Sequence, residues 1–105
     1  MSEEETIVSP AADSEVDEEL REPKKFKVIL LNDDYTTMEF VVDILEKVFN
    51  KSPSEATKIM LKVHNEGQAV CGIYPKEIAE AKVETVHRLA RKEGFPLMCT
   101  MEEAE

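Results

Sequence analysis

The chain has 105 residues, of which 42% are hydrophobic and 34% are charged, which is enough for one small domain. Thirteen Lys and Arg stand against twenty-three Asp and Glu. The resulting net charge of −10 argues against a nucleic-acid binder, because phosphate contact needs a basic face. No apolar run approaches the roughly 20 residues that cross a bilayer, and the acidic start lacks the basic and apolar parts of a signal peptide. We therefore expect a cytoplasmic protein that contacts neither nucleic acid nor membrane.

Negative charge is concentrated in the first 22 residues, which hold nine acids and one base, a net charge of −8. The remainder holds fourteen acids and twelve bases and is nearly neutral. The few apolar residues of the first part are scattered and cannot offset the entropy of ordering it. We expect residues 1–23 to form a disordered acidic arm and residues 24–105 a folded domain. Such an arm either solubilises the protein or docks on a larger partner.

Three strands and three helices are predicted after the arm. Short apolar, β-branched runs indicate the strands, and apolar residues at three- and four-residue steps indicate the helices. The predicted strands are 26–31, 68–74 and 97–101, and the predicted helices are about 36–50, 52–67 and 75–94. Ser52 and Glu55 form a capping-box pattern at the start of the second helix. The order is β-α-α-β-α-β, an α+β fold with three helices on one face of a three-stranded antiparallel sheet.

Two polar features are candidates for a binding site. Asn32, Asp33 and Asp34 directly follow a buried strand, where they form either an ordinary Asx turn or a site at the rim of the core. His64 shares a helical face with Met60 and is either a partly buried, hydrogen-bonded residue or a ligand-binding one.

The other candidate residues have simpler interpretations. Cys71 and Cys99 lie among apolar neighbours, and we expect small core residues rather than a disulfide, a metal clip or a reactive thiol. His87 lies off the apolar stripe of its helix and is expected to be solvated. Met38 and Met60 lie on the inner faces of two helices, where they either fill the core or form a deformable pocket wall.

Four segments closely resemble the ClpS adaptor family, in the order and at the spacing of that family. They are the sequence KVILLNDDYTTMEF at 27–40, IMLKVH at 59–64, AVCGIY at 69–74 and PLMCTM at 96–101. The resemblance covers about residues 24–101. It implies an adaptor without catalytic residues, metal or cofactor, which binds substrates with N-terminal Leu, Phe, Tyr or Trp. Such an adaptor delivers them to a Clp ATPase, usually the N-terminal domain of ClpA, for degradation by ClpP. The family fold is similar to the C-terminal domain of the ribosomal stalk protein.

The resemblance also assigns roles to residues. The substrate's α-amino group is assigned to Asn32, Asp33 and His64. The substrate's first side chain is assigned to a pocket of Leu30, Asp34, Thr36, Met38, Val41, Met60, Val63 and Leu97. ClpA docking is assigned partly to Glu77 and Lys82, and delivery requires the N-terminal arm. Many relatives carry Pro where Thr37 stands, and we expect this difference to loosen the loop.

Two other functions remain open from the residues. One is an interaction module, expected to be a monomer like the adaptor, which binds a partner without recognising a free chain end. The other is a small enzyme that uses His64 with Asp33, Asp34 or Cys71, although no ligand spacing supports a metal. The module predicts binding that does not depend on a free α-amine, and the enzyme predicts bound metal or a reactive thiol.

Overall fold

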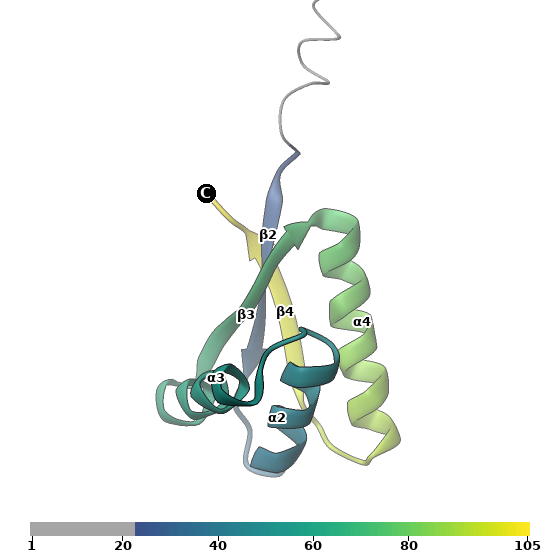
Figure 1. Ribbon diagram of the computed structural model, residues 1–105. Helices are drawn as coiled ribbons and strands as arrows, with labels where there is room; N and C mark the ends of the chain where they lie inside the picture. Colours follow the sequence, from purple (N-terminus) through teal and green to yellow (C-terminus); the bar gives the residue numbers. More distant parts are fainter. Residues whose placement is uncertain (1–22) are drawn as a thin grey trace, which may run out of the picture.

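A computed structural model describes residues 23–105, and the predicted arm therefore lies outside the described residues except for Pro23. The elements, in chain order, are β2 (Lys25–Leu31), α2 (Met38–Lys47), α3 (Pro53–Glu66), β3 (Gln68–Pro75), α4 (Lys76–Lys92) and β4 (Met98–Glu103). This order confirms the predicted β-α-α-β-α-β fold (Figure 1). Within residues 23–105, no helix combines the length and apolar character that a membrane span needs.

The sheet has the order β3-β2-β4, and both pairs are antiparallel. In the central strand, Leu30 lies opposite Ala69 of β3 and Cys99 of β4. Because side chains alternate between the two faces of a strand, these three residues share the face that the helices cover. Their neighbours along the strands point to the other, open face. The C-terminal end of the central strand β2 therefore lies at one end of the sheet, next to α2 and α3 (Figure 1).

The core fills the space between the sheet and the helices. Its largest fully buried side chains are Leu30, Leu45, Leu97, Val28, Val86, Cys71 and Cys99. Within the described residues no polar or charged residue is buried. Burial of such apolar side chains contributes roughly 1.5–3 kcal/mol each, and the polar groups of the protein are left for the surface and the loops.

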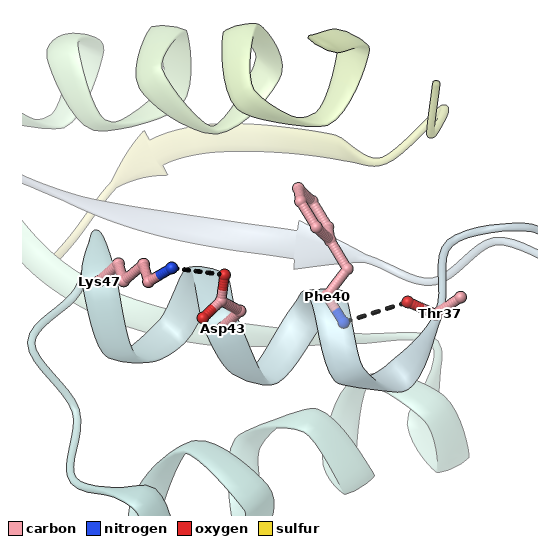
Figure 2. A network of polar contacts seen from close by, with 4 residues as sticks. All are labelled: Thr37, Phe40, Asp43 and Lys47. Atoms are coloured by element: carbon pink, nitrogen blue, oxygen red, sulfur yellow. Dashed lines mark hydrogen bonds and ion pairs between the residues drawn. The ribbon is translucent and has the colours of Figure 1, made fainter. Parts of the chain in front are cut away.

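Side-chain caps fix where α2 and α3 begin. The Thr37 hydroxyl accepts a hydrogen bond from the Phe40 backbone N–H at 3.1 Å, and Lys47 pairs with Asp43 at 3.1 Å further along the helix (Figure 2). Thr37 is therefore the residue that caps α2. The Ser52 hydroxyl accepts from the Glu55 N–H at 3.1 Å, which is one half of the predicted capping box.

Two expectations differ from the structure. Helix α2 ends at Lys47 rather than near Asn50, because Asn50 adopts a left-handed φ of 57° that a helix cannot continue. The prediction that His87 is solvated is wrong. His87 is half-buried, and its Nε2 accepts a hydrogen bond from the Cys99 backbone N–H at 3.0 Å. Cys99 lies near the start of the edge strand β4, and His87 satisfies a donor there that no other strand of the described chain reaches.

Candidate functional site

One small pocket collects most of the predicted site residues. It has a volume of about 210 Å³ and lies between the loop after β2 and the helices α2 and α3. Its lining comprises Asn32, Asp33, Asp34, Thr36, Met38, Val41, Met60, Val63 and His64. Pockets for drug-sized ligands usually measure about 300–1,000 Å³, so this one suits a single side chain.

A backbone hydrogen bond brings the two polar parts of the pocket together. The Asn32 N–H donates to the Gly67 carbonyl at 2.9 Å and thereby joins the end of β2 to the end of α3. Gly67 ends that helix with φ 94°, a left-handed conformation that glycine adopts without a steric penalty. His64 lies in the last turn of the same helix. Asn32 and His64, although far apart in the sequence, consequently line one opening.

The Asp33 carboxylate organises the loop. Its Oδ1 accepts hydrogen bonds from the backbone N–H groups of Tyr35 at 2.8 Å and Thr36 at 2.7 Å. Its Oδ2 accepts from the Thr36 hydroxyl at 2.7 Å. Burial alone would raise the pKa of Asp33, but these hydrogen bonds and the positive charge of Arg91 outweigh it and lower the pKa. The segment is thus both an Asx turn and part of the wall of the candidate site. The Asp33 carboxylate gives this wall a negative charge.

The apolar wall comes from α2 and α3. Val41, Met60 and Val63 are almost fully buried, whereas Met38 is 44% exposed at the pocket edge. The two helices pack against each other, so their methionines face the same opening. Met is unbranched and adapts to different apolar groups, which suits a wall that contacts more than one side chain.

Leu30 and Leu97 were also predicted for the side-chain pocket. The structure places both in the core, with exposures of 0% and 1%, and neither is among the residues that line the pocket. Arg91 of α4, which the sequence patterns did not single out, contacts the backbone of the segment that leads to β4. Its Nη1 donates to the carbonyl oxygens of Phe95 at 2.9 Å and Leu97 at 3.0 Å. Helical spacing alone could not reveal that contact, because it depends on where the chain turns after Gly94.

His64 is exposed and forms no hydrogen bond or ion pair of its side chain with another residue of the described part. The interpretation as a partly buried, hydrogen-bonded residue is therefore wrong. No group of three or more His, Cys, Asp or Glu within residues 23–105 could hold a metal ion. A ring nitrogen that lines a pocket without a protein partner is available to a ligand.

The two cysteines are core residues, as predicted. Cys71 is 1% exposed and Cys99 is 2% exposed. Burial raises the pKa of both thiols to about 12. Because the thiolate is the reactive form, neither residue has the properties of a catalytic nucleophile.

The predicted ClpA-docking residues lie on another surface. Glu77 is exposed on α4, and Lys82 is half-buried further along the same helix. Both line a shallow groove of about 490 Å³ beside Ile78, which is 47% exposed. The Lys82 ammonium donates to the Val48 carbonyl at 2.7 Å and lies 5.4 Å from the centre of the Tyr74 ring. Lys82 thus also joins α4 to the end of α2.

A larger hollow of about 580 Å³ lies at the opposite end of the sheet, around Phe26, Pro75 and Ile78. Its polar lining consists of Lys and Glu side chains only, at the margin of an apolar surface. It lacks the combination of amide, carboxylate and imidazole beside an apolar wall. We therefore take the smaller pocket at the end of β2 as the candidate site.

Comparison with known proteins agrees with this fold. The model of the family "ATP-dependent Clp protease adaptor protein ClpS" matches residues 21–100. The ATP-dependent Clp protease adapter protein ClpS of Nitratidesulfovibrio vulgaris is 59% identical over 88 residues, which cover 84% of this chain and 88% of the relative. The protein of the same name from Desulfatibacillum aliphaticivorans is 64% identical over 80 residues, 76% of this chain and 77% of the relative.

A solved structure is similar throughout the folded part. Agrobacterium tumefaciens ClpS2, bound to L-phenylalaninamide, matches with a TM-score of 0.76 and 42% sequence identity, and the match covers 79% of this chain and 100% of that chain. Together with the family model and the relatives, this match identifies an adaptor of a Clp protease rather than an enzyme. The chain belongs to the ClpS family of ATP-dependent Clp protease adaptors.

Proposed function

We propose that this adaptor binds substrates whose first residue is Leu, Phe, Tyr or Trp and delivers them to ClpA for degradation by ClpP. One observation carries the proposal. A single pocket is lined at one side by Asn32, Asp33 and His64 and at the other by Met and Val side chains. A chain end with an apolar first residue has the same two parts, a charged amine and an apolar side chain.

The polar side of the pocket suits an α-ammonium group. This group has a pKa of roughly 7.7–8.0, carries three N–H donors and needs acceptors when it leaves water. Asn32 offers an amide oxygen, and His64 offers a ring nitrogen in its neutral form. Asp33 already accepts three hydrogen bonds within its loop, so its main contribution is its negative charge. Each hydrogen bond to a charged group contributes roughly 1.5–3 kcal/mol.

The apolar side of the pocket suits the first side chain of the substrate. Burial of a Leu or Phe side chain contributes roughly 1.5–3 kcal/mol. L-Phenylalaninamide, to which the Agrobacterium relative is bound, combines a free α-amine with a Phe side chain. We expect a β-branched first residue such as Ile to clash with the wall, so that selectivity arises from rejection as well as attraction.

Delivery would use other parts of the chain. We propose that Glu77 and Lys82 contact the N-terminal domain of ClpA and that the acidic arm, residues 1–23, is required for transfer of the substrate. Both α4 residues lie away from the pocket lining, so substrate and ATPase could bind at the same time. We expect this to take place in the cytoplasm, with the adaptor as a monomer.

Peptide binding tests the proposal most simply. Four labelled peptides that differ only at the first residue, Leu, Ile, Met or N-acetyl-Leu, are titrated with the full chain by fluorescence anisotropy. Tight binding of Leu alone is the expected result. Equal binding of Leu and N-acetyl-Leu, or no binding of any peptide, would contradict recognition of a chain end and favour a general interaction module.

The delivery step needs its own variant. Glu77→Lys should leave peptide binding unchanged and weaken binding of the adaptor to ClpA, measured with the ATPase immobilised on a sensor surface. His64→Ala should do the opposite, with peptide binding weakened and ClpA binding unchanged. Loss of both activities in Glu77→Lys would contradict separate surfaces.

A further inference from the structure

A basic groove runs along the outer edge of β3 and shares no lining residue with the candidate substrate pocket. It has a volume of about 400 Å³ and lies between that edge and α3. Lys51, Lys58 and Lys62 line it, opposed by one acid, Glu55. None of the three lysines forms an ion pair within residues 23–105, where the ion pairs involve Lys24, Lys27 and Lys47.

The strand at the bottom of this groove is unpaired on one side. β3 is an edge strand, and no other strand of the described chain lies beyond it. An edge strand presents a row of backbone N–H and C=O groups that can pair with an added strand. Two large apolar side chains on the same edge also remain open, since Val70 is 40% exposed and Ile73 is 53% exposed. Because α3 lies on the opposite side of the groove, one wall is basic and the other is apolar.

The acidic segment 15–20 of the same chain has a complementary pattern. Its sequence is Glu-Val-Asp-Glu-Glu-Leu, with four acids and two apolar residues. With a period of two residues, Glu15, Asp17 and Glu19 point to one side, and Val16, Glu18 and Leu20 point to the other. Three acids would then face the three lysines. Val16 and Leu20 would face Val70 and Ile73, with Glu18 between them on the same side.

We propose that segment 15–20 docks on the outer edge of β3 as an added strand, with its acidic side toward Lys51, Lys58 and Lys62. Residues 21–24 connect the segment to β2. The five extended steps from Leu20 to Lys25 span about 17 Å. Crossing β3 from its outer edge to β2 requires two strand spacings, about 10 Å, so the connection is long enough. Attachment to the same chain raises the effective concentration of the segment to the millimolar range, which populates even a weak contact.

Docking of this kind would be electrostatic and reversible. Exposed ion pairs weaken as salt shortens the Debye length from about 10 Å at 0.1 M to about 3 Å at 1 M. The docked segment would leave the substrate pocket open, because that pocket and the groove share no lining residue. The contact is therefore independent of the proposed recognition of N-terminal residues, and failure of one does not affect the other.

A nitroxide on the arm provides the test. In the full chain, Ser14→Cys supplies one labelling site, since Cys71 and Cys99 are buried and their thiols have a pKa of about 12. Amide intensities in ¹H–¹⁵N spectra are compared with the nitroxide oxidised and reduced at about 0.1 M salt. We expect selective loss of intensity from Gln68 to Ile73 and around Lys58 and Lys62, and recovery at about 1 M salt.

Charge reversal distinguishes the groove from general proximity. The double variant Lys58→Glu, Lys62→Glu should reduce the added relaxation of the β3 amides roughly fivefold. Reversal of Asp17 and Glu19 to Lys in the same chain should restore it. The matched control, Arg88→Glu with Lys92→Glu, has the same spacing on α4 but lies outside the groove and should change nothing.

Three results would overturn docking within one chain. They are no intensity loss along β3 at low salt, a loss that persists in Lys58→Glu, Lys62→Glu, and a loss centred on Met38 and His64. A mixture of nitroxide-labelled chain with ¹⁵N chain that lacks the label provides the last control. Intensity loss in that mixture would place the arm on a second copy and would also overturn the assignment.

Discussion

The two histidines occupy opposite situations on two amphipathic helices. His64 is exposed in the last turn of α3, lines the candidate pocket and has no hydrogen-bond partner within the described residues. His87 is half-buried in α4, and its Nε2 accepts the Cys99 N–H at 3.0 Å. The imidazole of His87 accepts a hydrogen bond from a backbone N–H at the edge of the sheet. The imidazole of His64, beside the loop after β2, is available to a ligand. The comparison predicts that one residue carries binding and the other carries stability.

The largest expected effect is the loss of binding in His64→Ala. Removal of one acceptor for a charged amine should cost about 1.5–3 kcal/mol, roughly 10- to 150-fold in Kd, for every accepted first residue. Thermal unfolding should be unchanged, because His64 is exposed. Anisotropy titrations and a melting curve on the same sample measure both quantities, and an unchanged Kd would contradict a role for the imidazole in holding the amine.

His87→Ala should show the reverse behaviour. The Cys99 N–H would lose its partner in a half-buried site, at a cost of about 1–3 kcal/mol in the free energy of unfolding. The Kd for a peptide with N-terminal Leu should stay within about twofold of wild type, since His87 does not line the pocket. Denaturant unfolding measures the loss, and His87→Gln, whose side-chain oxygen can accept a hydrogen bond, should recover part of it. Equal losses in both variants would show that the hydrogen bond is unimportant.

Met38→Ala sharpens the comparison between the polar and apolar sides of the pocket. Met38 is only partly buried, so its removal should change the binding free energies by about 1 kcal/mol. It should also alter the ranking of Leu, Phe, Tyr and Trp. Leu61→Ala is a matched control, because Leu61 is 43% exposed on α3 and does not line the pocket. A uniform loss for all first residues, like that of His64→Ala, would contradict the division between amine and side-chain recognition.

The smallest expected effect is a pH dependence that originates at Asp33. Hydrogen bonds from Thr36 and Tyr35 lower its pKa in the folded state. Because the folded-state pKa is below the unfolded value of about 3.9, this stabilisation is fully present above that pH and is lost as the pH falls through the folded pKa. The difference in Tm between wild type and Asp33→Asn should therefore stay constant down to about pH 5 and shrink between about pH 5 and pH 2. A difference in Tm that stays constant over this range would contradict a stabilising role of the Asp33 carboxylate.

Local patterns were sufficient for the fold. Strand 26–31 was predicted to within one residue because all its residues except Lys27 are apolar, and α3 because Ser52 and Gly67 mark its ends. The end of α2 was missed because Asn50 takes up a left-handed conformation that the apolar spacing does not reveal. Hydrophobic periodicity states which face is buried but not where a turn begins.

The candidate site depended on more than local pattern. Residue types alone left His64 open between a structural and a binding role, and the family resemblance joined it to Asn32 and Asp33. The Asn32–Gly67 hydrogen bond explains how the chain brings them together. The error at His87 has the same origin, since its partner Cys99 lies 12 residues away on another element. Contacts between elements cannot be inferred from the spacing within one of them.

The most direct test uses two ligands that differ by one acetyl group. Phenylalaninamide and N-acetyl-phenylalaninamide are titrated into the ¹⁵N-labelled full chain, and amide shifts are mapped. With recognition of a free chain end, the first ligand shifts Asn32, Asp33, Met38 and His64, and the acetylated ligand shifts none of them at the same concentration. Equal shifts with both ligands, or shifts confined to the groove around Glu77 and Ile78, would contradict the proposed site.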